Sequence, residues 1–380
     1  MEKVKETFKE LQKRFKENFV ANSILLMIVA LIIFLSLYIW YISNLSKREC
    51  SLMDSLYQTK PTYISSFKNV EVYTFKDYYI KTAYNCCSGG SYKNDFVSDC
   101  PLKNIIKQGV RGLDFEIYSI DDEPVVATST VPSNYIKETY NSINFSTVME
   151  VINNSAFMSD TCPNPDDPII LHLRIKSTNQ TMLSNMAKIF SGYADKMLEP
   201  VYSYEYTSDI NSTNQFYTHN LGNVKLTDLC GKYVIIVDRI NAAFMDNKDF
   251  YEYVNMTSSS MFMRALNYYD VKFTPDMNEL QEYNKKNMTI AMPDVGINPE
   301  NPSGVVCREM GCQLIAMRYQ LFDANLQENM IFFDIAGSAF ALKPERLRYI
   351  EQTIEETPPN PPELNFATRS ITTDYYSIQT

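Results

Sequence analysis

The chain has 380 residues, of which 45% are hydrophobic and 13% aromatic. This apolar content is enough for one large core and excludes general disorder, and the length suits two average domains or one barrel of roughly 250 residues with additions. The formal net charge of −10 argues against a nucleic-acid partner, because neutralising phosphates requires a basic surface, and no Arg/Lys-rich run with interleaved aromatics supplies one.

Residues 1–18 form a basic arm before the first apolar run. Val4, Phe8, Leu11 and Phe15 recur at helical spacing, which predicts an amphipathic helix. Two alternatives stay open for this cytosolic arm: it lies on the membrane surface, or it is an ordinary helical extension of the segment that follows.

Residues 19–43 give the strongest local signal, because no charged residue occurs between Phe19 and Ser43. At about 1.5 Å rise per residue, this run is long enough to cross a hydrocarbon core of about 30 Å. Tyr38, Trp40 and Tyr41 lie at its end, where aromatic rings favour the membrane interface. The run is longer than the apolar part of a signal peptide and lacks the polar face of a soluble helix, so we predict a retained transmembrane helix.

The charges that flank this run predict its orientation. Six basic residues precede it, whereas only Lys47 and Arg48 closely follow it. By the positive-inside rule the N-terminus is cytosolic. Residues 44–74 are then a juxtamembrane connector, and everything beyond lies on the lumenal, extracellular or virion-exterior side.

Cysteines and glycosylation sequons agree with a location in an oxidising compartment. All eight cysteines lie beyond the span, so up to four disulfides of unassigned pairing are expected. Seven N-x-S/T sequons make the chain a glycoprotein candidate; they begin at Asn44, Asn144, Asn153, Asn179, Asn211, Asn255 and Asn287.

Beyond the connector, short apolar runs alternate with segments of helical length, such as Asn144–Phe157 and Thr181–Leu198. This alternation predicts a parallel sheet with helical crossovers, either open or closed as a barrel. The expected strands are Tyr78–Tyr84, Val110–Ile120, Pro124–Thr130, Pro168–Ile175, Tyr233–Asp238, Met288–Met292 and Gln313–Tyr319. Residues 351–380 begin with a Pro-rich stretch and continue as a weakly apolar, polar tail, either loose or an extended arm.

Eight segments, in the right order, resemble the catalytic X and Y halves of eukaryotic phosphoinositide-specific phospholipase C. The resemblance implies a TIM-like (β/α)8 barrel over residues 75–350, with an X half at 75–239, a linker at 240–282 and a Y half at 283–350. The segments are YIKTAYN (79–85), GVRGLDFEIY (109–118), EPVVATS (123–129), DPIILHLRIKS (167–177), GKYVIIVDR (231–239), YNKKNMTIAMP (283–293), GCQLIAMRYQ (311–320) and AFALKPERLR (339–348).

The family's chemistry is metal-assisted attack of the inositol 2-hydroxyl on the phosphodiester, with two histidines as acid and base. In this chain the first histidine position is Tyr84 and the second is Thr128. Neither side chain is a general base at neutral pH, so the resemblance implies a barrel with no intact catalytic residue. Of the two histidines in the chain, His172 is expected to be packed inside the barrel and His219 to be solvated in a loop.

The family's calcium ligands are only partly retained. Asn85, Asp114 and Glu116 fall on ligand positions, but Arg174 replaces the third acidic ligand. A guanidinium can fill the charge role of a divalent cation beside two carboxylates. We therefore expect a metal-free ion cluster with no calcium cofactor.

The family's substrate contacts are also mostly lost. Its phosphate-binding lysines fall on Ile236 and Asp238, and its arginine–tyrosine pair falls on Ile290 and Met292. The positive charges left for a lipid headgroup are Arg174, Lys176 and Arg239.

Two classes of function follow. The first is a membrane-anchored, non-catalytic barrel that binds proteins in an assembly or captures a lipid headgroup. The abundance of Asn, Ile, Tyr and Lys suggests a large DNA virus, and hence a virion membrane protein. The alternative is a phosphoric diester hydrolase or lyase that acts on a phospholipid with altered catalytic residues.

Overall fold

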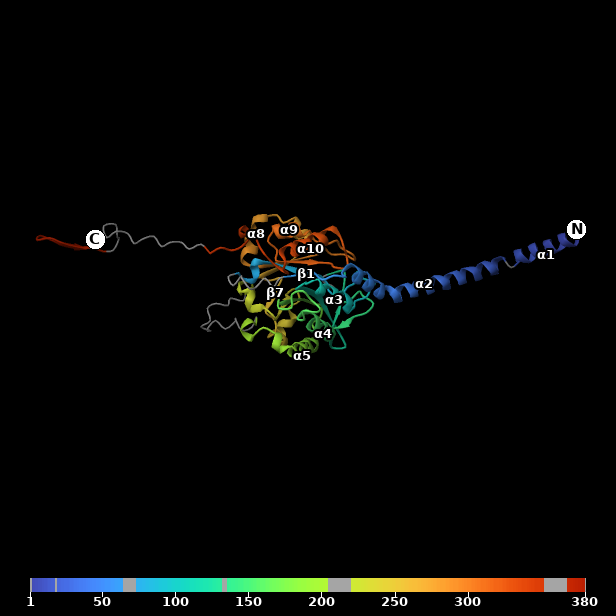
Figure 1. Cartoon of the computed structure of the whole chain (residues 1–380), viewed down its shortest axis with the longest axis horizontal. Coiled ribbons are helices and arrows are strands. Elements are labelled where there is room, and N and C mark those ends of the chain that lie inside the picture. Colours follow the sequence, from blue (N-terminus) through green and yellow to red (C-terminus); the bar gives the residue numbers. More distant parts are fainter. Residues whose placement is uncertain are drawn as a thin grey trace. The chain divides into compact units, whose positions relative to one another are not determined.

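The computed structural model describes residues 2–17, 19–63, 73–131, 135–203, 220–351 and 368–379. The chain divides into two compact units, Met1–Arg348 and Tyr349–Thr380. The first unit contains a barrel of parallel strands surrounded by helices (Figure 1).

Within the described residues, eight strands form one nearly closed parallel sheet in the order β7-β6-β5-β2-β1-β10-β9-β8. No ladder joins β7 to β8, so the barrel has one open seam there. The strands are β1 (Tyr78–Ala83), β2 (Gly112–Ile120), β5 (Ile169–Ile175), β6 (Tyr233–Asp238), β7 (Met256–Ser258), β8 (Met263–Asn267), β9 (Met288–Met292) and β10 (Leu314–Met317). This arrangement confirms the predicted TIM-like barrel.

Helices cover the outside of the barrel, and three short antiparallel strands extend its sheet. The helices are α3 (Asp99–Lys107), α4 (Phe145–Ala156), α5 (Gln180–Ser191), α6 (Lys248–Tyr251), α7 (Tyr268–Lys272), α8 (Met277–Lys286), α9 (Gly304–Glu309) and α10 (Ala324–Ala336). The added strands are β3 (Glu123–Ala127) on β2, β4 (Ile143–Asn144) on β3 and β11 (Phe340–Leu342) on β1.

Side-chain alternation along the strands divides the core into two layers. On β2, Leu113, Phe115 and Ile117 pack in the larger apolar cluster with the helices. A second cluster, which includes Ile170 and Ile236, fills the space inside the barrel. Since successive strand residues point to opposite faces, the alternate residues of β2 and β5 also point into the barrel.

All seven strands expected from the sequence are present. Residues 240–282, which the resemblance assigns to a linker, instead hold two further barrel strands, β7 and β8, together with α6, α7 and most of α8. β7 has only three residues, so no periodic pattern marks it, and it is a strand because β6 pairs with it in parallel register.

The predicted span is part of a longer helix, α2 (Phe19–Leu56), which follows α1 (Glu2–Glu17). The segment Ser23–Leu56 is the one described helix long and apolar enough to cross a membrane, judged by length and composition. Its apolar side chains are exposed from Ile24 to Tyr41. The helix therefore continues 13 residues past Ser43, so the first part of the expected connector is helical.

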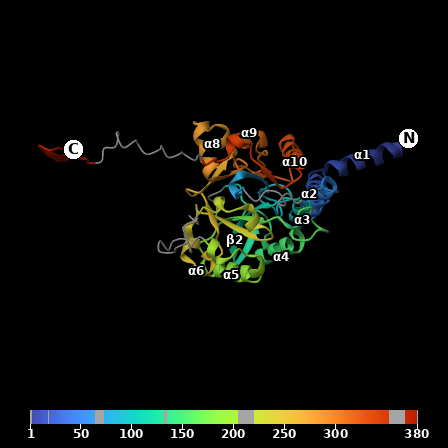
Figure 2. The ribbon, with the colours of Figure 1, turned by 60° about the vertical axis from the view of Figure 1, so that its left-hand side comes forward.

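The last turns of α2 are fixed to the barrel. Leu45, Met53 and Tyr57 are buried, and the Tyr57 hydroxyl donates to the Tyr319 carbonyl at 2.6 Å. Figures 1 and 2 show that α3 and α10 lie on the side of the barrel that α2 approaches, whereas α8 lies on the side away from it.

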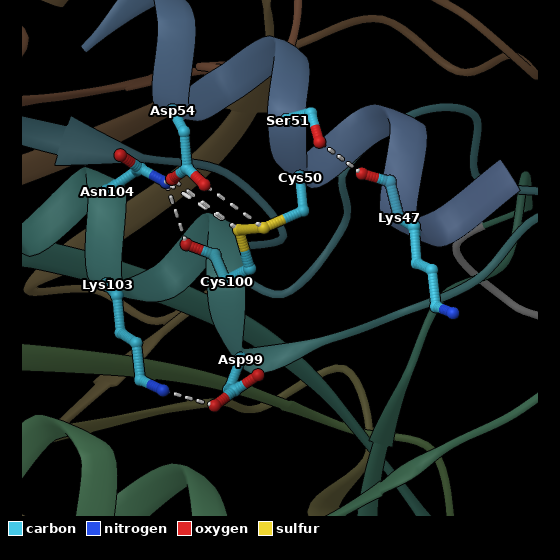
Figure 3. Close-up of a disulfide and its surroundings, with 8 residues drawn as sticks. All are labelled: Lys47, Cys50, Ser51, Asp54, Asp99, Cys100, Lys103 and Asn104. Carbon is cyan, nitrogen blue, oxygen red and sulfur yellow. Dashed lines mark hydrogen bonds and ion pairs between the residues drawn. A yellow bond between two sulfur atoms is a disulfide. The ribbon is translucent and has the colours of Figure 1, made fainter. Parts of the chain in front are cut away.

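A disulfide between Cys50 of α2 and Cys100 of α3 cross-links this contact, as Figure 3 shows. Beside it, the Asn104 amide donates to the Asp54 carboxylate at 2.7 Å. The disulfide closes a separation of 50 residues, and a link of this length typically contributes about 2–4 kcal/mol to folding stability. Asp54 and the two sulfur atoms lie close together, but sulfur atoms joined to each other are not thiolate ligands, so we assign no metal to them.

The folded chain has fewer disulfides than the sequence allows. The six remaining cysteines are thiols: Cys86, Cys87, Cys162, Cys230, Cys307 and Cys312. The chain therefore forms one disulfide where up to four were expected, because the other cysteines pack as small apolar residues. Among the sequons, Asn255 is buried and its amide oxygen accepts from Ile235 N at 2.8 Å, so the folded barrel excludes a glycan there. Asn211 lies outside the described residues.

The second unit contains a short hairpin of β12 (Ser370–Thr372) and β13 (Ser377–Gln379). All six of its strand residues are exposed. The described part of the Pro-rich tail is thus a small extended element and not a coil throughout.

Candidate functional site

The predicted site residues meet where the parallel strands end, at the face where TIM-barrel active sites lie. Tyr84 and Asn85 directly follow β1, and Lys176 directly follows β5. Asn85 has φ 46°, a left-handed conformation that asparagine tolerates better than most residues. This turn places its backbone N–H 3.2 Å from the Asp114 carboxylate.

Strand register brings the charged residues together. In the parallel pair β2–β5, Asp114 lies opposite His172 and Glu116 lies opposite Arg174. Because residues two apart on a strand share a face, all four side chains point into the barrel. All four are also buried, so the carboxylate and guanidinium charges are compensated by one another and not by water.

Arg174 is hydrogen-bonded to all three residues that stand at the family's retained calcium-ligand positions. Its Nε and Nη2 donate to the two oxygens of Asp114 at 3.0 and 2.7 Å. Its Nη1 donates to Glu116 at 2.6 Å, and Nη2 also donates to the amide oxygen of Asn85 at 2.8 Å. The guanidinium thus occupies the centre of the oxygen cluster, with the half-buried Tyr84 ring stacked 4.5 Å away.

The residues present do not fit a calcium ion. Calcium takes six to eight oxygen ligands at about 2.3–2.6 Å. Here Asn85, Asp114 and Glu116 already point their oxygens at one buried cation, and Asn85 leaves its amide Nδ2 without a hydrogen-bond partner. A second cation in the same cluster would lie against the Arg174 guanidinium.

The charges within the cluster keep its ionisable groups in one protonation state near neutral pH. Burial alone would raise the pKa of Asp114, but Arg174 and His172 outweigh it and hold that pKa below its ordinary range. Burial opposes the charge of Arg174, yet Asp114 raises the pKa of Arg174 well above its ordinary value. Burial also raises the pKa of Tyr84. Near neutral pH none of these three groups exchanges a proton.

Thr128, at the family's second histidine position, points away from the ion cluster. The Thr128 side chain is buried and its hydroxyl donates to the Tyr92 carbonyl at 3.0 Å. Glu116 is instead held by Ser129, whose N–H and hydroxyl lie 2.9 and 3.2 Å from it, and by the Tyr118 hydroxyl at 2.7 Å. Tyr118 and Ser129 were not predicted, although Tyr118 lies two residues beyond Glu116 on the same strand face.

His172 forms a hydrogen-bonded chain below the ion cluster. Its Nδ1 lies 2.6 Å from Asp114, and its Nε2 lies 2.8 Å from the Ser258 hydroxyl. The residue types are those of a Ser-His-Asp triad, but both His172 and Ser258 are buried, and neither lines the pocket that contains Glu116 and Arg174. This row of hydrogen bonds from Ser258 through His172 holds Asp114 in place. His219 lies outside the described residues.

A small pocket opens above the cluster. Its walls include Tyr84, Glu116, Arg174, Lys176 and Asp238, and its volume is about 100 Å³. Ligand pockets usually measure about 300–1,000 Å³, so this opening is smaller than those that enclose a whole ligand.

Of the three predicted anion contacts, two line this pocket. Arg174 is bonded to carboxylates, and burial together with Arg174 lowers the pKa of Lys176. The Arg239 side chain is exposed and lies outside the pocket wall. Ile236 and Ile290, at positions where the family has basic residues, belong to the apolar interior.

Comparisons with known proteins agree with this architecture. Residues 73–234 match the sequence model of the phosphatidylinositol-specific phospholipase C X domain. This match includes Tyr84, Asn85, Asp114, Thr128 and Arg174.

Solved structures of cephalopod proteins show the same fold. PLC21 of L. pealei has a TM-score of 0.58 and 18% identity, over 74% of this chain and 38% of that protein. PLC21 of S. officinalis has a TM-score of 0.57 and 19% identity, over 75% of this chain and 39% of that protein. A comparison with curated proteins finds no match. The main folded unit thus contains a PLC-like TIM barrel, and the chain corresponds to less than two fifths of the length of these two proteins.

Proposed function

We propose that this chain is a membrane-anchored PLC-like barrel with a non-catalytic role, in which the barrel binds protein partners within an assembly at a membrane. The observation that carries the proposal is Arg174, which pairs with both Asp114 and Glu116 from the centre of the cluster. An internal cation of this kind replaces the metal charge, but it offers no open coordination position to a substrate.

The acid–base positions support the same proposal. General acid–base catalysis typically contributes about 10²–10⁴-fold per group and needs a pKa near the working pH. Tyr84 has a pKa raised above its ordinary value, and Thr128 is hydrogen-bonded to the backbone. The barrel keeps the shape of an enzyme while lacking a proton acceptor at either place.

The anchor in this proposal is α2, with the N-terminus cytosolic and the barrel on the far side of the membrane. The mean hydropathy of 2.7 over an 18-residue window of this helix supports the span, and the charge difference across the run supports the orientation. The abundance of Asn, Ile, Tyr and Lys also favours an origin in a large DNA virus. In that case the membrane is that of the virus particle, and the assembly is the virion.

The test uses the full chain in detergent or nanodiscs. We expect titration calorimetry to show no micromolar calcium binding, and phosphatidylinositol or lysophospholipid substrates to give no cyclic or open phosphate product. Product release that Asp114→Asn abolishes would overturn the proposal in favour of a phosphodiesterase with altered catalytic residues.

A further inference from the structure

The first helix, α1 (Glu2–Glu17), has apolar residues along one side only. They recur every three or four residues, at Val4, Phe8, Leu11 and Phe15, so on a helix they fall on one face. Phe8 is 69% exposed, which means that no described part of the chain covers its ring. Ten of the 16 residues of α1 are charged, so this helix is too polar to extend the span through the bilayer.

The charges of α1 are sorted around this apolar face. At about 3.6 residues per turn, the charged positions that border the face are all basic; they are Lys3, Lys5, Arg14 and Lys16. The acidic positions all fall on the opposite side of the helix; they are Glu2, Glu6, Glu10 and Glu17. The apolar face is therefore flanked by positive charge on both sides.

A second copy of α1 is the competing partner for this face, because the same spacing fits the apolar seam of a coiled coil. In a coiled coil, acidic and basic residues beside the seam pair between the helices. The positions beside this seam contain no acidic residue; they are Lys5, Thr7, Gln12 and Arg14. Two copies would therefore bring basic residues together without a counter-charge, whereas lipid phosphates would supply one.

The helix adjoins the proposed span directly. α1 ends at Glu17 and α2 begins at Phe19. The residue between them is Asn18, a residue type that favours turns and helix ends over helix interiors. The charge-free run begins at Phe19, so the junction of the two helices marks the edge of the hydrocarbon core.

We propose that α1 lies in the plane of the cytosolic leaflet, with the chain turning between Glu17 and Phe19, and that its partner is anionic lipid. Its 16 residues then cover about 24 Å of membrane surface. The apolar face enters the boundary between headgroups and acyl chains. The flanking Lys and Arg stems stay in apolar surroundings while their charged ends reach lipid phosphates. This contact lies on the side of the membrane opposite the barrel.

The inference rests on the proposed membrane anchor, and a first measurement tests the anchor by itself. The chain contains one tryptophan, Trp40, within the apolar run. In nanodiscs that hold the full native chain, lipids brominated on their acyl chains should quench Trp40 fluorescence about twofold or more. If Trp40 is not quenched, the anchor fails, and the inference about α1 fails with it.

The placement of α1 is measured in a Trp40→Phe background. Phe8→Trp should be quenched about twofold or more by lipids brominated near the headgroup end of the acyl chain, and be shielded from iodide. The matched control is Glu6→Trp, at an exposed position on the opposite face of the same helix. It should respond to iodide and not to brominated lipid.

Two other results would overturn the inference while leaving the anchor intact. If α1 extends straight into water, iodide quenches Phe8→Trp and Glu6→Trp alike. If α1 pairs with a second copy, Phe8→Trp is shielded from both quenchers.

The choice of lipid is tested with two variants that lose the same charge. Lys5→Gln with Arg14→Gln removes basic residues beside the apolar face, whereas Lys9→Gln with Lys13→Gln removes them from the opposite side. In nanodiscs with phosphatidylserine, the first pair should lower the lipid quenching of Phe8→Trp about twofold or more, and the second pair should lower it less. In phosphatidylcholine alone the two pairs should behave alike. Equal losses in phosphatidylserine would overturn the proposed contact of the flanking residues with anionic lipid.

Discussion

At the scale of single residues, Arg174 sets the chemistry of the barrel. Asp114 and Glu116 are buried carboxylates, and a buried charge without a partner costs several kcal/mol. A guanidinium meets this need with directed hydrogen bonds, and its planar fork can serve two carboxylates at once. The same hydrogen bonds fix the orientation of the Arg174 guanidinium, so the ion cluster is a structural part of the barrel.

Replacing this cation tests its role. Arg174→Met keeps an unbranched apolar stem but removes the guanidinium that pairs with two buried carboxylates, so we expect a loss of about 3–5 kcal/mol in unfolding free energy. Chemical denaturation of the full chain in detergent measures it. The matched control, Arg239→Met at an exposed position, should change stability by less than about 0.5 kcal/mol.

If Arg174→Met proves too unstable to purify, neutralising its partners provides a second measurement. Adding Asp114→Asn and Glu116→Gln to Arg174→Met should recover part of the lost stability, because no unpaired charge remains buried. Equal stability of Arg174→Met and Arg239→Met would show that the ion cluster does not support the fold.

At the scale of elements, α2 combines two environments in one helix. Its first part is apolar on all sides. Its last turns pack on the barrel through Met53 and the Cys50–Cys100 disulfide, and Tyr57, directly after the helix, is also buried. Between them, Glu49 lies against Gly89 and Gly90 in the segment after β1. Burial and the neighbouring Asp95 raise the pKa of Glu49 to about 8, although Arg48 opposes the shift.

This carboxyl predicts a pH dependence for the contact between α2 and the barrel. A carboxyl whose pKa is raised on folding stabilises the folded state most below its ordinary pKa of 4.5, and this contribution is lost as pH rises through about 8. We therefore expect Glu49→Gln, which mimics the protonated form, to raise the melting temperature relative to the native chain more at pH 8.5 than at pH 5. The control is Glu150→Gln, at an exposed position on α4. Its melting temperature should differ from that of the native chain by the same amount at both pH values. If the melting temperatures of Glu49→Gln and the native chain differ by the same amount at both pH values, Glu49 is not the cause of the pH dependence.

At the scale of the whole molecule, a single helix joins a proposed membrane span to a rigid barrel without an intervening linker. The pocket is therefore held at a fixed height relative to the span, unlike a site on a freely tethered domain. This geometry suits a component whose partner lies at the membrane surface, because its binding surface is already oriented.

The orientation of the chain can be measured by translation with microsomes. With the N-terminus cytosolic, the native sequons should give a mobility shift that endoglycosidase removes, and Asn153→Gln should reduce the number of glycan-bearing species. A sequon added before Lys3 serves as the control and should remain unmodified. Modification of the added sequon without modification of the barrel would reverse the proposed topology.

Several features follow from the amino-acid sequence by itself, because they depend on local patterns. The apolar run at 19–43, the seven strand segments and the shared face of Asp114 and Glu116 arise from residue type and spacing along the chain. The motifs in their order were enough to predict the barrel. By resemblance they also predicted that Tyr84, Thr128 and Arg174 stand as replacements at working positions, which stays a prediction.

Other features were decided only by the tertiary structure. Strand β7 exists because β6 pairs with it, and the disulfide pairing depends on α2 packing against α3. The contact of Arg174 with Asn85, Asp114 and Glu116 depends on three strands lying side by side in one register. The physical reason is range: alternation and hydropathy act between near neighbours in sequence, whereas pairing and burial join residues that only the folded chain brings into contact.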